Sequence, residues 1–477
     1  MFQINRGGRC FTMGWGKLTF FLPLAAVLCG CTTYQQQGLE MTTQWRAGNV
    51  QAAAAAYSKK AQSKAKSKDA IIWKLEEATA LRVNGRFQES IEAFKQAEAL
   101  IDRYEETARV KLSQEAAALL VNQALLPYEG RTYDKIMLNT YKALNYMNLG
   151  DIDRARVELI RAYQRQQDAV EINRRRIEKV QEEAAKRREK EIIQKAENDG
   201  QFKQQISGLS PDLNSLAPYA DYVNPFTVFL DGLFFMATAT GPSDLERARK
   251  SFERVMAFSP GNRYVANDLE TVKQLLQGKR MPPTTYVIFE TGRAPIREQV
   301  RIDIPIIITR VSYVGAAFPK LVMQPDYVTG LEVRGGNCVE KTALVCSMDS
   351  VIGREFKNEL PIIITKTLVS TMAKATANYF INDAMERQDE VLGLLSRLLT
   401  AGAQAAVNIA DLRTWTTLPK EFQYCRLPTP PDRKLTITTA NGLQKTDYVL
   451  QDGVVNVVLV RSISPSTPMW ITQFKLQ

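Results

Sequence analysis

The chain has 477 residues, of which 45% are hydrophobic and 24% are charged, and its formal charge at pH 7 is +11. This composition is typical of globular proteins, and the length is sufficient for two or three domains. Histidine is absent, which excludes Ser-His-Asp and Cys-His catalysis and His-ligated zinc, while carboxylate, Lys and Tyr chemistry remain open. The excess of cations suits either anionic partners or simply a basic, soluble surface.

Residues 1–30 have the layout of an export signal. An apolar run of 11 residues at positions 18–28 follows three cations and no acidic residue, and it is too short to span a bilayer. The run ends in the sequence Leu28-Cys29-Gly30-Cys31, which resembles a bacterial lipobox. The resemblance implies that the mature chain begins at Cys31 with acyl chains such as palmitate on its thiol and amine. Two or more such chains anchor a protein stably to a membrane.

The residue after the lipobox indicates the membrane to which the protein is exported. Thr32, and not Asp, follows Cys31, and by the rule known for such lipoproteins this implies a bacterial outer-membrane protein that faces the periplasm. Export argues against nucleic acid as a partner, even though the chain keeps a charge of +8 once residues 1–30, with three cations and no anion, are removed. The start is either Met1 or Met13, because both leave a complete signal. The alternative is that Cys29 and Cys31 merely end a signal or anchor helix.

The mature chain would keep four cysteines, Cys31, Cys338, Cys346 and Cys425. With Cys31 acylated, an odd number of thiols remains in an oxidising compartment. Cys338 and Cys346 flank a segment of seven residues and could face each other across a hairpin, so we expect a disulfide between them. Cys425 would then be a buried free thiol or a competitor for either partner.

Residues 31–278 are predicted to form an all-α repeat domain. Segments aligned on Gly48, Gly85, Gly150 and Gly241 each place small and aromatic residues on two helices joined by a Gly turn. The first two glycines are 37 residues apart and the next interval is 65, close to one and two periods of the tetratricopeptide repeat, which has about 34 residues. The segments resemble tetratricopeptide repeats stacked in a solenoid. An irregular helical bundle is the alternative.

Residues 151–199 carry thirteen Lys or Arg and twelve Asp or Glu with almost no helix breaker, which predicts one long charged helix within this domain. Tyr163, Val170, Ile177 and Ala184 recur every seven residues. They would form a thin apolar stripe that leans on a neighbouring helix or forms a weak coiled coil. The alternative is a solvated helix without a partner.

Residues 279–477 are predicted to form an α+β domain. Apolar runs broken by Gly and Pro predict strands within residues 284–292, 298–318, 433–440, 448–451, 454–463 and 469–474, and two short strands within residues 327–348. A helix from Arg354, with Pro361 near its start, lies between them. The apolar segment at residues 391–410 contains Arg, Gln and Asn, which disfavours a membrane span, so we expect it to be buried in this domain or to lie at an interface. The predicted fold is therefore mixed, a helical-repeat solenoid followed by an α+β domain.

Several short motifs together resemble a family of bacterial envelope lipoproteins with tetratricopeptide-like repeats. They are Tyr133-Asp134-Lys135 with the Gly150 repeat, Asn224-Pro225-Phe226, Phe289-Glu290-Thr291-Gly292, Arg354-Glu355-Phe356-Lys357, and the run Ala410-Asp411-Leu412-Arg413-Thr414-Trp415-Thr416-Thr417-Leu418-Pro419. The last motif is the longest and most specific. Members of the family tend to be encoded near a lipoprotein that activates penicillin-binding proteins. The resemblance thus implies the peptidoglycan-synthesis machinery as a partner, and it supplies no catalytic residue.

Asp411, Arg413 and Trp415 are the candidate partner-binding residues. Arg and Trp are favoured anchors in interfaces, and in an extended turn Asp411 and Arg413 could pair or point at a ligand. The alternative is a corner of the fold in which Trp415 fills the core and Arg413 holds the loop in place. Substitution of Arg413 and Trp415 would distinguish the two, because the first predicts lost binding and the second predicts lost folding.

Two hypotheses of different classes follow. In the first, the anchored protein is a non-catalytic adaptor or scaffold in cell-envelope biogenesis, and its repeats present a concave face to protein partners. In the second, it is an envelope glycan-acting enzyme that uses Glu290 and Glu355, since such hydrolases need two carboxylates about 5–10 Å apart in a cleft. We favour the adaptor because we recognise no catalytic residue, cofactor site or metal site. A structural stalk built on the charged helix is a third, weaker option.

Overall fold

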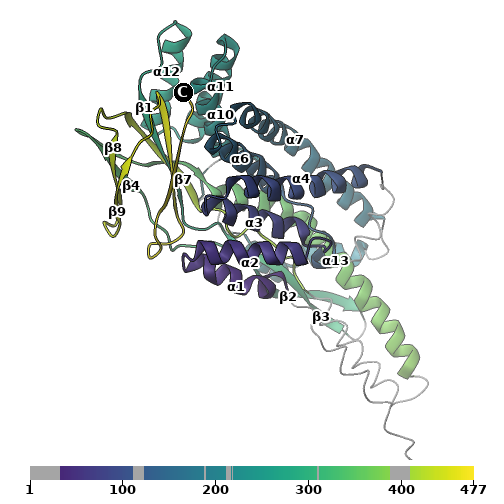
Figure 1. The fold of residues 1–477 in the computed structure, drawn as a ribbon. Coiled ribbons are helices and arrows are strands. Elements are labelled where there is room, and N and C mark those ends of the chain that lie inside the picture. Colours follow the sequence, from purple (N-terminus) through teal and green to yellow (C-terminus); the bar gives the residue numbers. More distant parts are fainter. Residues whose placement is uncertain are drawn as a thin grey trace, which may run out of the picture.

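The computed structural model describes residues 33–110, 123–186, 190–210, 216–217, 219–308, 311–386 and 409–477. The lipobox with Cys31 lies outside these residues, and so does nearly all of the apolar segment 391–410. Helices make up the described chain as far as residue 276, and strands with one long helix make up the rest (Figure 1). The order predicted from the sequence, a helical part followed by an α+β part, is therefore confirmed.

The helices pack as antiparallel pairs in chain order. Each pair contacts the next, and a last helix closes the row. The pairs are α1 (Tyr34–Arg46) with α2 (Val50–Ser63), α3 (Ala70–Val83) with α4 (Phe87–Val110), α6 (Thr132–Asn148) with α7 (Ile152–Ala185), and α10 (Pro225–Ala237) with α11 (Pro242–Phe258), followed by α12 (Arg263–Leu276). Shorter helical elements in this part are η2 (Gln123–Leu125), α8 (Lys190–Asn198) and α9 (Gly200–Ser207).

Three of the four glycines used to align the repeats make the same turn. Gly48, Gly85 and Gly150 have φ angles of 78°, 74° and 75°, in the left-handed region that suits glycine. In each turn the residue after the glycine donates its N–H to the carbonyl five residues earlier, as Arg86 does to Leu81 at 2.9 Å. This is the Schellman pattern at a helix C-terminus. Gly241 differs, because its φ of −176° is ordinary extended backbone.

Replacing Gly85 with Ala should lower the free energy of unfolding by about 1–2 kcal/mol, because an L-residue is strained in the left-handed conformation. No heavy atom lies within 4 Å of a Cβ built at this position, so the effect is conformational and not steric. Gly241→Ala is the matched control, since it is equally open and its backbone accepts Ala. Denaturant midpoints should fall for the first variant only; equal midpoints would contradict the role of the turn.

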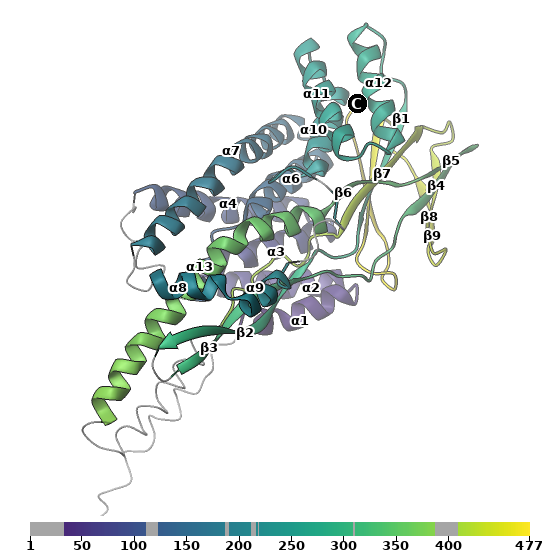
Figure 2. The same ribbon diagram turned by 180° about the vertical axis from the view of Figure 1, so that it is seen from behind.

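The charged segment 151–199 is not one continuous helix. α7 ends at Ala185 and α8 begins at Lys190, so the prediction of a single helix is wrong. α8 contacts α9, β2 and α13, and its Ile193 and Ala196 are buried there (Figure 2). The charge pattern could not reveal this break, since solvated charges are compatible with one helix or two.

The heptad stripe proposed for this segment is only partly buried: Ala184 is in the core, Ile177 packs against it, and Tyr163 lies under the Arg247 and Arg254 guanidiniums of α11. Tyr163 is 37% exposed and Val170 is 54% exposed, although Ala184 is buried. The buried face of α7 is made instead by residues spaced three and four apart, namely Ala155, Glu158, Leu159, Ala162, Gln166 and Ala169. These small and polar residues allow α7 to lie close against α6. The seven-residue repeat therefore misses most of the buried residues of α7.

A five-stranded mixed sheet forms the centre of the C-terminal part. Its order is β11-β10-β1-β7-β6; β1 and β10 are parallel, and the other neighbours are antiparallel. The strands are β1 (Thr284–Thr291), β6 (Ala343–Ser347), β7 (Glu421–Pro428), β10 (Val455–Ser462) and β11 (Trp470–Lys475). β1 and β10 are buried along their whole length, as expected for strands covered on both faces.

Two smaller antiparallel sheets complete this part. One is a hairpin of β2 (Ile296–Ile308) and β3 (Val311–Val322), and the other has the order β5-β4-β8-β9. Its strands are β4 (Leu331–Gly335), β5 (Cys338–Lys341), β8 (Lys434–Thr439) and β9 (Lys445–Val449). Residues 327–348 thus supply three short strands and not the two predicted.

The helix predicted from Arg354 starts earlier. α13 runs from Met348 to Glu386, so Pro361 lies inside it and not near its start. It extends beside β2 and β3 away from the body of the protein (Figures 1 and 2). No helix in the described part of the chain is long and apolar enough to cross a membrane.

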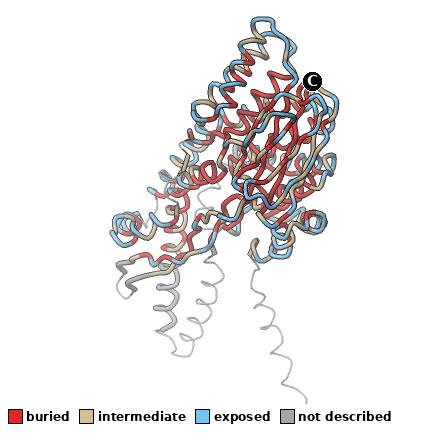
Figure 3. Tube along the Cα trace, turned by 90° about the vertical axis from the view of Figure 1, so that its left-hand side faces the viewer, coloured by how far each residue is buried: buried red, intermediate tan, exposed pale blue. Residues whose placement is uncertain are grey.

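The helical and α+β parts share one hydrophobic core. A continuous cluster of buried residues runs from α1 through the helices into the five-stranded sheet and α13, and Figure 3 shows buried segments on both sides of the contact. The predicted domain division, 31–278 and 279–477, falls in the connection between α12 and β1. Across this division the two parts are packed together, so residues far apart in sequence can form common sites.

Candidate functional site

The first helix of each central pair faces the α+β part of the protein. α3 buries every residue except Lys74, and α10 buries all of its residues. α6 is buried almost as completely. We call α3, α6 and α10 the inner row, and the surface where they meet the α+β part the junction. The second helices, α4, α7 and α11, keep an exposed face and form the outer row.

The segment 409–420 crosses the inner row as a loop and places Trp415 in the core. The indole is 1% exposed, and its ring lies 5.9 Å from the rings of both Phe94 and Tyr141. Its Nε1–H donates to Thr79 at 2.9 Å and to Thr417 at 3.0 Å. Trp415 therefore joins α3, α4 and α6 to the α+β part.

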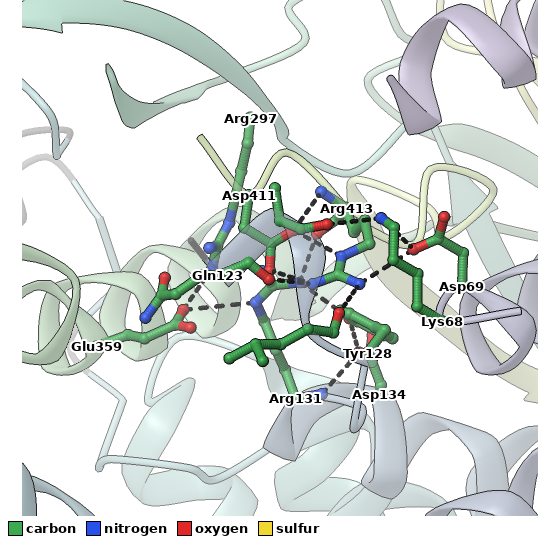
Figure 4. A network of polar contacts seen from close by, with 12 residues as sticks. Lys68, Asp69, Gln123, Tyr128, Arg131, Asp134, Arg297, Glu359, Asp411 and Arg413 are labelled. Carbon is green, nitrogen blue, oxygen red and sulfur yellow. Dashed lines mark hydrogen bonds and ion pairs between the residues drawn. The ribbon is translucent and has the colours of Figure 1, made fainter. Parts of the chain in front are cut away.

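Arg413 holds the start of this segment against the helices (Figure 4). Its guanidinium pairs with Asp411 at 2.7 Å and with Asp69 at 3.0 Å. It also donates to the backbone carbonyls of Gln123 and Leu126. Although burial alone would raise the pKa of Asp411, the neighbouring Arg413 and Arg131 guanidiniums hold that pKa well below its usual range. The carboxylate is thus ionised in the fold.

These contacts settle the place of the three candidate partner-binding residues. Arg413 and Trp415 are 3% and 1% exposed, and Asp411 is bound to Arg413. A partner cannot reach side chains that are buried in the folded protein. The prediction of a partner-binding site at Asp411, Arg413 and Trp415 is therefore wrong for this structure, and the alternative of a core-filling corner agrees with it.

Glu76 on α3 also binds the segment 409–420. Its carboxylate accepts hydrogen bonds from the N–H groups of Thr416 and Thr417 at 2.7 and 3.1 Å, and from the hydroxyls of Thr416 and Tyr34. Burial raises the pKa of Glu76, while these donors act in the opposite direction. An acidic residue with both oxygens bonded to one loop fixes the path of that loop across the inner row.

Glu290 on β1 binds Arg82 on α3 in a bidentate ion pair. The two N–H···O distances are 2.6 and 3.1 Å, and both side chains are buried. The Tyr141 hydroxyl donates to the same carboxylate at 3.4 Å. Arg461 on β10 donates to the Glu290 carbonyl and is also fully buried. Burial lowers the pKa of Arg461 to about 10, and Arg82 also lowers it while Glu290 raises it.

Glu355 and Glu359 on α13 tie that helix to the start of α6. Glu355 accepts from the N–H groups of Thr132 and Tyr133 at 2.7 and 2.9 Å, which are free donors at the first turn of a helix. One turn later, Glu359 pairs with Arg297 at 2.6 Å. The pKa of Glu359 is lowered to about 2, because Arg297 and Arg131 outweigh the effect of burial.

Glu355 should make stability depend on pH. Burial raises its pKa from the ordinary 4.5 to about 7. The folded state then holds the proton more tightly than the unfolded state, so this contribution to stability is complete below pH 4.5 and is lost as the pH rises to 7. From pH 5 to pH 8 the loss is on the order of 3 kcal/mol.

Urea midpoints measured between pH 5 and pH 8 test this expectation. Glu359 and Asp411, whose pKa values are lowered, act only below this range. Glu355→Gln should make the profile less steep, whereas Glu298→Gln, at an exposed position of β2, should keep the wild-type slope. A wild-type midpoint that is constant across the range would contradict the raised pKa.

Another buried acid, Asp268 on α12, binds the five-stranded sheet. It accepts from the hydroxyls of Tyr286 and Tyr424 at 2.7 and 2.8 Å and pairs with Arg426 at 2.6 Å. Sequence reasoning missed Asp268, as it missed Glu76 and Arg82. A usable signal existed for α3, since two acids and Arg82 interrupt a segment that is otherwise mostly apolar.

Residues from most of the motifs that carried the family resemblance lie at the junction, whereas Gly150 lies in an exposed turn. Asp134 accepts from the backbone N–H of Arg131 at 2.8 Å, and Asn224 caps α10 by accepting from Thr227. Phe226 stacks on Phe422 of β7, with ring centroids 3.9 Å apart. Together with Glu290, Glu355 and the segment 409–420, they hold the inner row on the α+β part.

The cysteines do not behave as predicted. Cys338, Cys346 and Cys425 are all free thiols, so the expected disulfide between Cys338 and Cys346 is absent in this structure. The reason is topological, because β5 pairs with β4 while β6 pairs with β7, and the two strands form no hairpin. The Cys346 thiol instead donates to the Asn224 side chain, and burial raises its pKa to about 12.

Glu290 and Glu355, the acids considered for glycan hydrolysis, both have structural partners. Glu290 is held by Arg82, and Glu355 caps α6. Both are buried, whereas a catalytic acid must reach its substrate. No group of three or more potential metal ligands occurs among the described residues. The buried acids at the junction therefore hold the helices of the inner row to the α+β part.

Comparisons with protein-family models, with curated proteins and with solved structures found no match to this chain.

Proposed function

We propose that this protein is a lipid-anchored, periplasm-facing lipoprotein of the bacterial outer membrane that serves as a non-catalytic scaffold for proteins of cell-envelope biogenesis. Its helix pairs, packed in chain order and joined by repeated glycine turns, support a tetratricopeptide-like arrangement. The resemblance noted in the sequence makes the peptidoglycan-synthesis machinery the first class of partner to test. Cys31 would carry the acyl chains.

The structure changes which face of the repeats we assign to partners. In repeat solenoids the concave face commonly binds the ligand, but here the inner row is covered by the α+β part of the same chain. Partners must then bind the outer row. This assignment follows from burial, because a covered face offers no surface for a second protein.

The observation that carries the proposal is the exposure of large apolar side chains on α7. Val157, Val170 and Ile172 are 47%, 54% and 57% exposed, and Tyr163 on the same helix is 37% exposed. We take these exposed apolar side chains as the positions at which to test for a bound protein partner. In the folded chain their neighbours are charged residues, which would form the polar rim of such an interface.

Site-specific crosslinking in intact cells tests this surface. A photoreactive amino acid at Val170 or Ile172 should capture a discrete envelope protein, and one at Asp447, an exposed position of β9, should not. Each captured protein would be identified by mass spectrometry. Recovery of bulk lipoproteins alone, or equal capture from both surfaces, would contradict a scaffold that binds through α7.

The proposed lipid anchor at Cys31 leads to a separate prediction. Cys31→Ser molecules from which the signal has been removed should leave the membrane fraction, because they lack the thiol that would carry the acyl chain. Fractionation of cells, with mass spectrometry of the N-terminal peptide, measures this. Persistence of Cys31→Ser in the membrane at the wild-type level, with the signal removed, would show that the anchor is elsewhere.

A further inference from the structure

A run of lysines joins α2 to α3 without any acidic residue among them. Between Met41 and Lys68 the sequence contains no Asp or Glu. Five lysines fall in the last ten positions of this stretch, and we call them the lysine turn: Lys59, Lys60, Lys64, Lys66 and Lys68. Lys59, Lys66 and Lys68 are exposed, and the other two are half-buried.

Internal contacts account for little of this charge. Within the described part of the chain, Lys68 pairs with Asp69 at 3.4 Å, and the other four form no ion pair. Lys60 lies over the Trp73 ring at 5.4 Å, and burial together with the nearby Lys64 lowers its pKa. Cations near the C-terminus of α2 do favour the helix, but that effect is confined to the last turn. It does not explain Lys66 and Lys68.

The lysine turn lies at the end of the molecule where the chain emerges from its proposed anchor. Tyr34, at the start of α1, packs on Trp73 with ring centroids 4.4 Å apart, and Lys60 lies on that same indole. Cys31 precedes Tyr34 by three residues, which span at most about 11 Å. An acylated Cys31 therefore brings the membrane surface close to these lysines.

An exposed apolar side chain lies beside the lysines. Lys68 Nζ donates to the carbonyl of Ala124 at 2.6 Å, and the next residue, Leu125, is 45% exposed. Cations next to an exposed apolar side chain are the combination found on protein surfaces that rest on a bilayer interface. The positive charge of the lysine turn and its position next to the proposed anchor thus both indicate an anionic membrane surface.

We propose that the lysine turn binds the anionic phospholipid headgroups of the leaflet that carries the Cys31 anchor. This inference rests on the anchoring in the proposed function and adds a second point of contact. A single acylated residue would let the folded part of the protein rotate about its attachment point. Two contacts with the membrane at one end of the molecule fix its orientation. The outer row would then be presented to partners at a defined angle to the membrane.

Lysine acetylation measures this contact on the intact mature lipoprotein. The protein is reconstituted in vesicles of phosphatidylcholine alone or of phosphatidylcholine with phosphatidylglycerol, and a neutral acetylating reagent is used so that the surface potential does not repel it. Acetylation of Lys59, Lys64 and Lys66 should be at least about threefold slower in the anionic vesicles, and high salt should restore it. Lys434 and Lys445, on β8 and β9 of the four-stranded sheet, should react equally in both.

Charge reversal provides a matched comparison with Lys68 as the reporter. In the triple variant Lys59→Glu, Lys64→Glu and Lys66→Glu, Lys68 should lose its protection. Three exposed lysines of the sheets, Lys434, Lys445 and Lys475, replaced in the same way, should leave Lys68 protected. Circular dichroism of both variants establishes that they are folded.

The outcomes separate this inference from the function on which it rests. If the N-terminal peptide carries acyl chains and all lysines react equally in the two kinds of vesicle, headgroup binding is refuted while the anchor stands. An unmodified Cys31 refutes both the anchor and this inference. Failure to capture a protein through α7 would refute the scaffold alone and would leave lysine protection as expected.

Discussion

Trp415→Ala should lower the free energy of unfolding by about 3–5 kcal/mol, as truncation of large buried aromatic residues does. Trp415 is among the largest fully buried side chains of the described chain. Its removal would leave a cavity between Phe94 and Tyr141, and these rings belong to helices α4 and α6. The hydroxyls of Thr79 and Thr417 would also lose their shared donor.

Guanidinium chloride midpoints of three variants distinguish a folding role from a binding role for Trp415. Trp415→Phe keeps most of the volume and loses the N–H, so it should cost only about 1–2 kcal/mol. Trp470→Ala is the control, because Trp470 lies half-exposed on β11 and should tolerate truncation far better. A stable Trp415→Ala protein that no longer captures partners would show instead that the side chain binds them.

Features of the fold that depend on local chemistry could be predicted from the sequence. The glycine turns at Gly48, Gly85 and Gly150 were predicted because a left-handed residue between two helices requires glycine. The runs around β1 and β10 were recognisable because strands buried on both faces are continuously apolar. These elements carry their own signal, independent of what packs on them.

Other features depend on neighbours that a sequence does not name. β7, which pairs with both β1 and β6, was missed because Arg426 and Glu421 give it a polar pattern. Their partners explain the pattern, since Arg426 binds Asp268 on α12. The same holds for Glu76, whose burial is favourable only because the segment 409–420 brings three donors to it and Tyr34 on α1 supplies a fourth.

The candidate site illustrates the ambiguity of Arg and Trp in a sequence motif. Both residues are favoured at interfaces, and both also serve where one part of a chain must hold another. Arg413 and Trp415 make contacts with α3 and with residues near Asp69 that are as specific as those of an interface. In this structure the motif makes contacts within the chain, between the segment 409–420 and the inner row, and does not form the partner-binding site that was predicted. Only the three-dimensional arrangement distinguishes the two cases.

Glu290→Gln should cost at least about 3–5 kcal/mol of unfolding free energy, the range found when one partner of a buried ion pair is removed. The loss should exceed that of Arg82→Met. Without the Glu290 charge, Arg82 and Arg461 both remain buried and cationic, and Arg82 also lies over the Tyr141 ring at 4.4 Å. Without Arg82, the carboxylate keeps Tyr141 as a donor and Arg461 as a nearby cation.

Denaturant unfolding of the two single variants and of the pair measures this asymmetry. In the double variant, Arg82→Met with Glu290→Gln, only Arg461 is left uncompensated, so its stability should lie above that of Glu290→Gln alone. Each variant would also be incubated with peptidoglycan glycan strands. Wild-type stability of Glu290→Gln, together with loss of a glycan-cleaving activity that the wild type shows, would overturn the structural role and restore the enzyme hypothesis. The predicted order, with Glu290→Gln least stable, follows from buried charge alone, because each variant is ranked by the number of guanidiniums it leaves without an anion.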